Sequence, residues 1–473
     1  MKKFICLIVA AMLSVTLFFC GCVDESNTPL NVTVNNSYLN MTDDQWREYM
    51  EKLTENGDTA QKQQAAISRS LLCGVSILTR FEYKTTGYVK QTSLGWGSSG
   101  LKRVGTQAYH RIYCGAGVIV QLDKTTGDAY IVTNCHVVYD DTSSSVTAEE
   151  VYLYLYGQDT EGENYEIGAK YCTYGGKTVF DSSGEALVDY DIKGITDDTK
   201  NTGYEKYCIS AEVIGASVTY DIALLKVSGS DALRSGTAMV AEFAESDDVY
   251  AGQPVYAVGN PEGDGMSVTS GVISRESELI ELNLSDKDED AYLDYRVIRT
   301  DAAINGGNSG GGMYNSDGEL VGIINSKSVS EEIDNMGYAL PGSNVKRLWL
   351  LMKDAYESGS SYFSASNPYI KRAVFPAEYK VASSSARLEN GYTVITQTLV
   401  VDKAAGGFQV GDVLKNIKIT DASGTVKEDR AITRSYHVED TLLSARDGYS
   451  VVFTVQRGGE DTQVSFTATT SKV

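Results

Sequence analysis

From about residue 71 to residue 345 the chain consists of short apolar runs separated by Gly, Asp and Asn. Runs such as Gly117–Val120, Ala129–Val132 and Val255–Val258 are long enough for one strand each and are bounded by residues typical of turns. This pattern predicts an all-β region and therefore a mainly β protein. With 473 residues, of which 42% are hydrophobic, the chain is long enough for two or three domains of roughly 150 residues.

The first residues have the pattern of an export signal. Lys2 and Lys3 precede an apolar run, Phe4–Phe19, that is too short to span a membrane as a mature helix. The run ends in Phe-Cys-Gly-Cys, which resembles a bacterial lipobox with cleavage after Gly21 and lipidation of Cys22. A plain secretory signal with two incidental cysteines is the alternative. We expect an exported lipoprotein on the outer face of the cytoplasmic membrane, or a periplasmic one in a Gram-negative cell.

Two helical stretches flank the β region. Thr42 and Gln45 form a capping-box pattern, and apolar residues then recur at helical spacing as far as Asn56-Gly57. A second helical face runs from Val345 to Tyr356. The predicted segments are a signal peptide (1–21), a tether (22–41), an N-terminal helical segment (42–70), the β region (71–358), a linker (359–375) and a smaller C-terminal module (376–473).

The balance of charges excludes several kinds of partner. The 41 Lys and Arg residues are outnumbered by 63 Asp and Glu residues, which gives a net charge of −22. Nucleic acid and anionic lipid head groups require clustered cations, so neither is an expected ligand. The three histidines, His110, His136 and His437, lie far apart and the sequence has no Cys-x-x-Cys pair. We therefore expect no metal site.

Three segments supply the groups of a serine nucleophile system. They are Ile131–Val138, Tyr220–Val227 and Thr300–Gly311. A serine hydroxyl attacks efficiently only when an imidazole takes its proton and a carboxylate orients that imidazole. We therefore expect Ser309 to be the nucleophile, His136 the base and Asp221 the orienting carboxylate.

The glycines around Ser309 predict a tight turn beside the nucleophile. Such a turn points the N–H groups of Gly307 and Ser309 at one spot, where an oxyanion would develop. Gly307, Asn308 and Ser309 are therefore the expected oxyanion-hole residues.

These segments resemble the trypsin-like serine proteases of the HtrA (DegP/DegS) family. The family's motifs read close to Thr-Asn-x-His-Val-Val, Asp-Leu-Ala-Leu-Leu-Lys and Thr-Asp-Ala-Ala-Ile-Asn-x-Gly-Asn-Ser-Gly-Gly, and the likeness covers most of residues 71–350. The resemblance implies two six-stranded β-barrels, with His136 and Asp221 on the first and Ser309 on the second. It also implies a cofactor-free endopeptidase that acts on unfolded or misfolded proteins, with a trimer as its basic assembly.

The resemblance also bears on specificity. Ala303 lies six residues before Ser309, where trypsin-like enzymes that cleave after Lys or Arg carry Asp. A basic primary pocket is therefore not expected. Ala303 and Ile304 are the expected pocket residues, and they favour medium apolar side chains, as the family does.

The spacing of the triad departs from the family. His136 and Asp221 are 85 residues apart, which is tens of residues longer than usual and implies an insertion near 159–206. Asp191 also lies in a Tyr-Asp-Ile sequence and is the competing carboxylate. Asp221 is preferred because Ile-Ala-Leu-Leu-Lys-Val follows it.

The C-terminal module, 376–473, resembles the PDZ domains that follow the protease in this family. Gly411–Leu414 is similar to the family's Gly-Asp-Val-Ile, and Val451–Val455 is expected to pair with Val464–Thr467 across a Gly-Gly turn. The resemblance implies that peptide C-termini bind there, with a carboxylate loop near Asn390–Thr393.

The cysteines leave two pairings open. In an exported protein Cys114 and Cys135 are one candidate disulfide, and Cys172 and Cys208 are another that would close the insertion. The alternative is that all of these thiols are free.

A second functional class is a peptide-binding scaffold without catalysis. The intact triad and the Gly-Asn-Ser-Gly-Gly turn argue against it. A third hypothesis is a partner-gated signalling protease that cuts one membrane partner, and the sequence does not separate it from a general quality-control enzyme.

Overall fold

The fold is described from a computed structural model of the whole chain. The described residues are 43–91, 100–157, 166–193, 209–244, 249–283, 292–327, 336–359 and 370–472. The expected signal peptide and tether, Cys22 included, lie outside them, as does most of the expected linker. Within the described ranges no helix is both long and apolar enough to cross a membrane.

Two helices precede the first strand. They are α2 (Asp43–Glu55) and α3 (Thr59–Cys73). The apolar stripe of α2 is buried at Trp46, Met50 and Leu53. Trp46 donates from Nε1 to the carbonyl of Asp317, and the Arg69 guanidinium lies 4.8 Å from the centre of the Trp46 rings. The stripe therefore packs on the body of the protein.

The first β unit is a seven-stranded antiparallel sheet. In spatial order its strands are β10 (Glu212–Ser217), β11 (Ile222–Val227), β3 (Asp128–Thr133), β2 (Leu101–Asp123), β1 (Gly74–Lys90), β4 (Glu150–Leu155) and β9 (Ile209–Ser210). Its core is formed by apolar residues of adjacent strands, among them Ile77, Ile119, Ile131 and Leu225. The curved sheet carries the short helices α4 (Cys135–Val138) and α5 (Asp231–Ser235).

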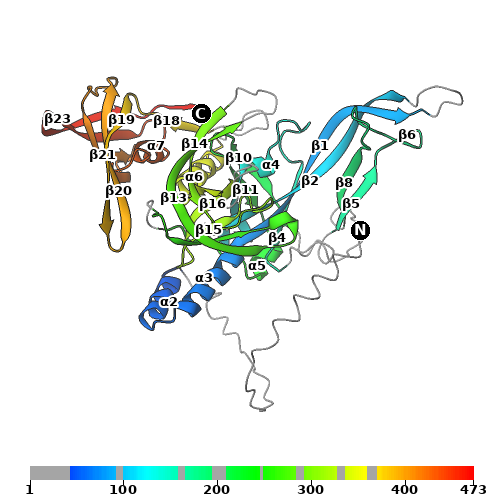
Figure 1. Ribbon diagram of the computed structural model, residues 1–473, viewed down its shortest axis with the longest axis horizontal. Coiled ribbons are helices and arrows are strands. Elements are labelled where there is room, and N and C mark those ends of the chain that lie inside the picture. Colours follow the sequence, from blue (N-terminus) through cyan, green and yellow to red (C-terminus); the bar gives the residue numbers. More distant parts are fainter. Residues whose placement is uncertain are drawn as a thin grey trace, which may run out of the picture. The chain divides into compact units, whose positions relative to one another are not determined.

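The second β unit is a closed six-stranded barrel (Figure 1). Its strands, in order around the barrel, are β12 (Pro254–Gly259), β13 (Ser267–Asn283), β14 (Tyr292–Thr300), β17 (Gly337–Pro341), β16 (Leu320–Lys327) and β15 (Gly312–Tyr314). A short 3-10 turn, η3 (Pro261–Gly263), follows β12. The mainly β, trypsin-like fold is confirmed. The expected first barrel is a half-barrel, because among the described strands β10 and β9 remain at opposite edges of the sheet.

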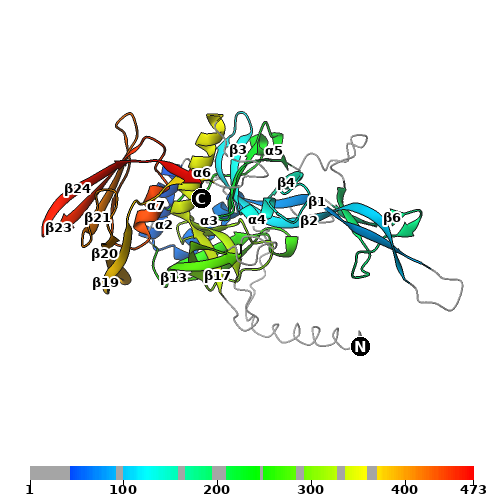
Figure 2. The ribbon, with the colours of Figure 1, turned by 90° about the horizontal axis from the view of Figure 1, so that it is seen from above.

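The expected insertion packs beside an extension of the first sheet. β1 and β2 continue as a two-stranded ribbon beyond their pairing with β4 and β3 (Figure 2). The inserted strands are β5 (Glu166–Tyr171), β6 (Thr173–Tyr174), β7 (Lys177–Thr178) and β8 (Val188–Lys193). Asp189 on β8 accepts hydrogen bonds from the backbone N–H and, at 2.8 Å, the Nδ1 of His110 on β2. Residues 158–165 and 194–208 of this region lie outside the described part.

Helix α6 (Gly342–Glu357) follows the barrel and packs against both β units. Its buried side chains include Val345, Leu348 and Met352, which belong to the helical face predicted from the sequence. A Cβ at Gly215 of β10 would lie 2.9 Å from Met352, so glycine allows the helix to approach the first sheet closely.

The C-terminal domain is an antiparallel sheet with one short helix, α7 (His437–Leu442). Its strands are β19 (Glu378–Glu389), β20 (Tyr392–Lys403), β21 (Val413–Thr420), β23 (Ser450–Arg457) and β24 (Glu460–Thr467), with β22 (Val426–Ala431) beside β21 and a separate pair, β18 (Lys371–Ala373) and β25 (Thr470–Lys472). Phe375, Phe408 and Phe453 form the centre of its core. The expected pairing of β23 with β24 is present.

The segment Asn390–Thr393, where the resemblance places a carboxylate loop, lies at a β-hairpin turn. Asn390 (φ 50°) and Gly391 (φ 90°) form the two-residue turn of the β19–β20 hairpin, in which Glu389 pairs with Tyr392. Tyr392 stacks on Tyr250 with ring centres 4.3 Å apart.

The candidate Cys114–Cys135 disulfide is absent. Both residues are free thiols, as is Cys172, whose expected partner Cys208 lies outside the described residues. Cys114 packs with the apolar cluster that contains Leu78, whereas Cys135 belongs to the core of the first sheet. The two side chains therefore face different apolar clusters.

Alkylation is expected to separate these thiols. Cys135 is 2% exposed, and burial raises the pKa of its thiol well above the usual value, so little reactive thiolate forms. We expect iodoacetamide at pH 8 to modify native Cys114 and Cys172 before Cys135, and all three after unfolding without reductant. Peptide mass spectrometry gives the order. A disulfide-linked peptide containing Cys114 and Cys135 would contradict the assignment.

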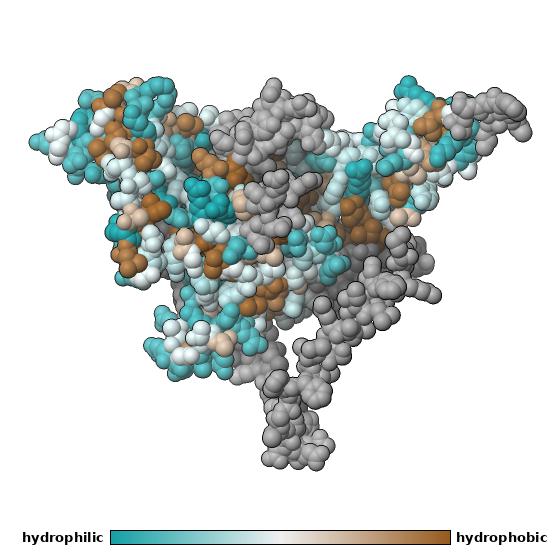
Figure 3. Space-filling model, in the orientation of Figure 1, coloured by the Kyte–Doolittle hydropathy of each residue, from teal (hydrophilic) through white to brown (hydrophobic). Residues whose placement is uncertain are grey.

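Figure 3 shows one face of the protein, on which apolar residues form small separate patches among polar ones. Scattered patches of this kind are ordinary for a protein surface and mark no interface by themselves.

Candidate active site

Three separate elements bring the expected catalytic residues together. His136 lies on α4, directly after β3, and Asp221 lies in the turn that leads into β11. Ser309 lies in the turn between β14 and β15 of the barrel. The Ala116 N–H donates to the Ser309 carbonyl at 2.8 Å, so β2 of the first sheet is joined to the serine turn of the barrel.

Asp221 holds His136 through two hydrogen bonds, one with its imidazole and one with its backbone N–H. The Nδ1 of His136 lies 2.8 Å from Oδ2 of Asp221, and the His136 backbone N–H donates to Oδ1 at 3.0 Å. Asn134 donates to the Asp221 carbonyl at 2.9 Å. Because Nδ1 carries the proton that faces the carboxylate, Nε2 remains available to accept a proton.

The backbone of Asp221 is in the left-handed region, with φ of 45°. Aspartate tolerates this region better than most residues. The competing carboxylate, Asp191, lies on β8 opposite Gly168. The structure thus pairs His136 with Asp221.

The negative charge of Asp221 raises the pKa of His136. Loss of solvent around the imidazole would lower the pKa of His136, but the adjacent Asp221 carboxylate outweighs that effect and raises the pKa above 6.5. The side chain is still 49% exposed, so a substrate can reach it.

Asn325 is a site residue that the sequence analysis missed. Its side-chain N–H donates to Oδ2 of Asp221 at 2.5 Å, and its carbonyl accepts the Ser309 hydroxyl at 2.9 Å. Asn325 is buried on β16. The sequence feature that could have indicated Asn325 is the segment Gly318–Ile323. This segment matches a family motif but ends two residues before Asn325.

The glycines fix the turn around the nucleophile. Gly307 has φ of 90°, and a Cβ there would lie 2.0 Å from the Asn260 carbonyl. The Glu262 N–H donates to the Gly306 carbonyl at 2.7 Å and holds the turn from outside. Glycine is therefore required at position 307 for both conformation and space.

The expected oxyanion-hole residues differ in whether their backbone N–H groups are available to bind an oxyanion. The Asn308 N–H donates to the Asn305 carbonyl at 3.1 Å and is not available for an oxyanion. Within the described residues the N–H groups of Gly307 and Ser309 donate to no other backbone group. These two donors on a glycine turn are suited to a developing negative charge.

A family model, the trypsin-like peptidase domain, matches residues 115–323, a stretch that contains His136, Asp221 and Ser309. The chain is 34% identical over 145 residues to "Serine protease Do-like HtrA" of Bacillus subtilis (strain 168), with 30% of each protein covered. It is 27% identical over 336 residues to the protein of that name from Lactobacillus helveticus, with 67% of this chain and 74% of the relative covered.

Residues 115–323 are therefore similar to trypsin-like peptidase domains, and the chain resembles proteins named as HtrA serine proteases. Among solved structures, "HtrA-type protease AlgW with tripeptide" is 19% identical with a TM-score of 0.42, and 86% of this chain and 97% of that one are covered. The match to the Bacillus relative spans less than a third of the length of either protein.

The two expected pocket residues lie in different environments. Ala303 is exposed, and its carbonyl accepts the Thr269 hydroxyl at 2.9 Å. Ile304 is buried in the core of the barrel, where it fills the space beside Gly337. Residues 328–335, which follow β16, lie outside the described part.

Asn325 is expected to support the proposed triad. Asn325→Ala removes a hydrogen bond to the charged Asp221, and we expect kcat/KM to fall about 10- to 100-fold. Asn325→Ser keeps a donor and should lose less, whereas Asn325→Asp places a second carboxylate beside Asp221 and should lose more. Peptide hydrolysis by the three purified variants provides the measurement. Full activity of Asn325→Ala would contradict the role.

Proposed function

We propose that the protein is a serine endopeptidase that hydrolyses peptide bonds through His136, Asp221 and Ser309. The observation that carries this proposal is the 2.8 Å contact between His136 and Asp221 beside a serine on a glycine turn with two uncommitted N–H groups. The relatives named as serine proteases support the same reaction.

In the proposed mechanism, Ser309 attacks the peptide carbonyl while Nε2 of His136 takes the hydroxyl proton. Asp221 stabilises the imidazolium, and the N–H groups of Gly307 and Ser309 stabilise the oxyanion. His136 then protonates the leaving amine, and an acyl-enzyme on Ser309 forms. Water activated by His136 releases the acyl group and restores the Ser309 hydroxyl.

We propose unfolded or misfolded proteins as substrates, with cleavage after medium apolar residues. The absence of an acidic side chain at Ala303 supports the second part, because a carboxylate at that position selects Lys or Arg. We further propose an exported protein anchored by lipid at Cys22, on the lipobox-like sequence, and a trimeric assembly by analogy with the family. The segment boundaries, including the protease domain at 71–358, belong to the same proposal.

We also propose that the C-terminal domain, 376–473, is PDZ-like and binds peptide C-termini. Among the described strands β19 pairs only with β20, so its other edge is open. An open strand edge is a common docking place for an extended peptide.

A partner-gated protease is the second candidate, and one contact favours it. The Ser309 hydroxyl donates to the backbone carbonyl of Asn325 at 2.9 Å. A serine held in this way can become reactive when a bound ligand changes the rotamer of its side chain.

The test is digestion of unfolded casein by the chain from residue 23 onward, which contains the compact unit Asp43–Val473, with a Ser309→Ala control. We expect cleavage that the control lacks, with cut sites after apolar residues. Cleavage only after addition of C-terminal peptides would support the gated form. No cleavage under either condition by a folded protein would contradict the proposed activity.

A further inference from the structure

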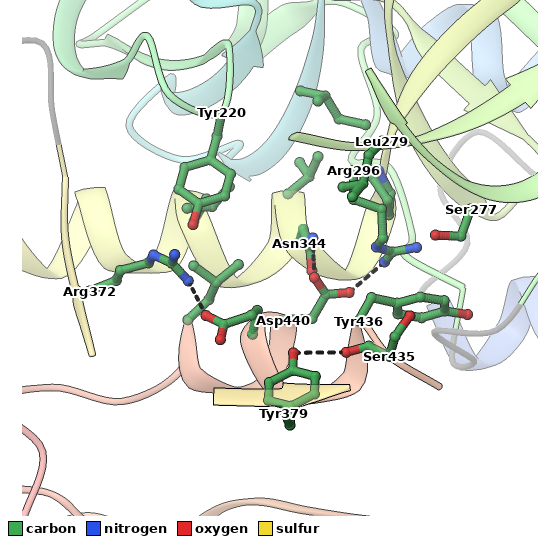
Figure 4. Close-up of a pocket in the computed structure, with 16 residues that line it drawn as sticks. Tyr220, Ser277, Leu279, Arg296, Asn344, Arg372, Tyr379, Ser435, Tyr436 and Asp440 are labelled. Carbon is green, nitrogen blue, oxygen red and sulfur yellow. Dashed lines mark hydrogen bonds and ion pairs between the residues drawn. The ribbon is translucent and has the colours of Figure 1, made fainter. Parts of the chain in front are cut away.

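A cavity of about 300 Å³ lies between the barrel, α6 and the C-terminal domain (Figure 4). Its apolar walls include Leu340, Leu348 and Leu443. Tyr220 enters it from the first sheet, so three parts of the chain meet in this space. Nothing in the mechanism above uses the cavity.

Tyr220 directly precedes the catalytic carboxylate in the chain. Figure 4 shows its ring extending into the cavity above α6. Desolvation raises the pKa of the Tyr220 hydroxyl, in keeping with a ring enclosed by protein. The backbone next to it is constrained as well, since Asp221 has φ of 45° and its N–H donates to the Val218 carbonyl at 3.3 Å. Tyr220 and the residue that holds His136 therefore lie in one constrained turn.

The far wall of the cavity is held by a buried polar network, which we call the Asp440 clasp: Asp440, Arg296, Asn344 and Tyr436. Arg296 of β14 donates to Oδ2 of Asp440 on α7 at 2.6 Å, and Asn344 of α6 donates to Oδ1 at 2.9 Å. The Arg296 guanidinium also lies 4.0 Å from the ring centre of Tyr436.

The two charges of the clasp are largely shielded from solvent. The side chains of Arg296 and Asp440 are 6% and 7% exposed. Removing one member leaves the other charge buried without its partner, which is strongly unfavourable. The barrel, α6 and α7 are therefore held together at this point, opposite Tyr220.

We infer that Tyr220 is a positioning residue that makes the placement of the catalytic carboxylate Asp221 depend on the seating of the C-terminal domain by the Asp440 clasp. With the clasp closed, α6 and α7 enclose the Tyr220 ring and the turn before β11 is fixed. With the clasp open, the ring loses one wall and Asp221 is less well aligned with His136. This inference rests on the proposed peptidase function.

The experiment compares Tyr220→Ala, Tyr220→Phe and Asp440→Asn in the chain from residue 23 onward. Misalignment of a catalytic group by about 1 Å costs on the order of 100-fold. We expect Tyr220→Ala and Asp440→Asn to lower kcat about 10- to 100-fold with little change in KM, and Tyr220→Phe to restore most of it. Lys403→Ala is the matched control, because it breaks an exposed ion pair of the C-terminal domain, with Glu378, outside the residues that line the cavity.

A second readout separates this inference from the proposed activity. The chain has three histidines, so NMR titration can resolve His136 in each folded variant without any substrate. Because Asp221 raises the pKa of His136, we expect a lower value in Tyr220→Ala and Asp440→Asn and no change in Lys403→Ala. An unchanged His136 titration and an unchanged kcat in Tyr220→Ala would overturn the inference, even if casein is cleaved.

Discussion

Ser309→Ala is expected to lower turnover of a peptide substrate by about 10⁴- to 10⁶-fold, because it removes the only atom that can form the acyl-enzyme. His136→Ala should cost a similar factor, since the hydroxyl then has no base. The two residues act in one step, so the double variant should be hardly worse than either single variant. Initial rates on a fluorogenic peptide with an apolar residue before the cleaved bond provide the measurement.

The matched control for this prediction is Ser274→Ala, which removes the hydroxyl of an exposed serine on β13 of the same barrel. It should keep the full rate. Near-full activity of His136→Ala would show that the proposed triad is not the catalytic system. Additive losses in the double variant would show that Ser309 and His136 do not act together.

Asp221→Asn is expected to lower kcat by about 10⁴-fold and to move the acidic limb of the pH profile. The asparagine amide favours the wrong tautomer of His136, which accounts for the lower rate. The pH shift has a definite sign. Activity requires neutral His136, and the Asp221 carboxylate raises the pKa of that residue above 6.5. Without the carboxylate the imidazole loses its proton at lower pH, so the residual activity should rise at lower pH than in the parent.

The control for this prediction is Asp191→Asn, because the sequence offers Asp191 as the competing carboxylate. Asp191 lies on β8 of the insertion, opposite Gly168. Its variant should keep both the rate and the pH profile of kcat/KM. A shift of the acidic limb in Asp191→Asn, with none in Asp221→Asn, would reverse the assignment.

The motifs predicted the positions that depend on local chemistry. His136, Asp221 and Ser309 each lie in a short segment whose neighbours are needed for the turn or strand that presents the side chain. The helical face of Val345 and Leu348 was predicted for the same reason, since a repeat of 3.6 residues is read directly from the chain.

What the sequence did not predict depends on contacts between distant segments. Asn325 touches Asp221 across 104 positions of the chain. Ile304 turns into the barrel core because Gly337 of another strand leaves it room. The disulfide hypothesis for Cys114 was wrong because adjacency to a catalytic histidine in the sequence does not fix which apolar cluster Cys135 faces. The seating of α7 by Asp440 depends equally on partners from β14 and α6.

The division of the proposed catalytic residues between two β units has a consequence for how such a protein is made in the cell. His136 and Asp221 are carried by one hydrogen-bonded sheet and Ser309 by another, and the two are joined at contacts such as that between Ala116 and Ser309. A chain that is still being synthesised or exported contains His136 before it contains Ser309. We therefore expect the proposed peptidase activity to arise only after both units have folded and docked.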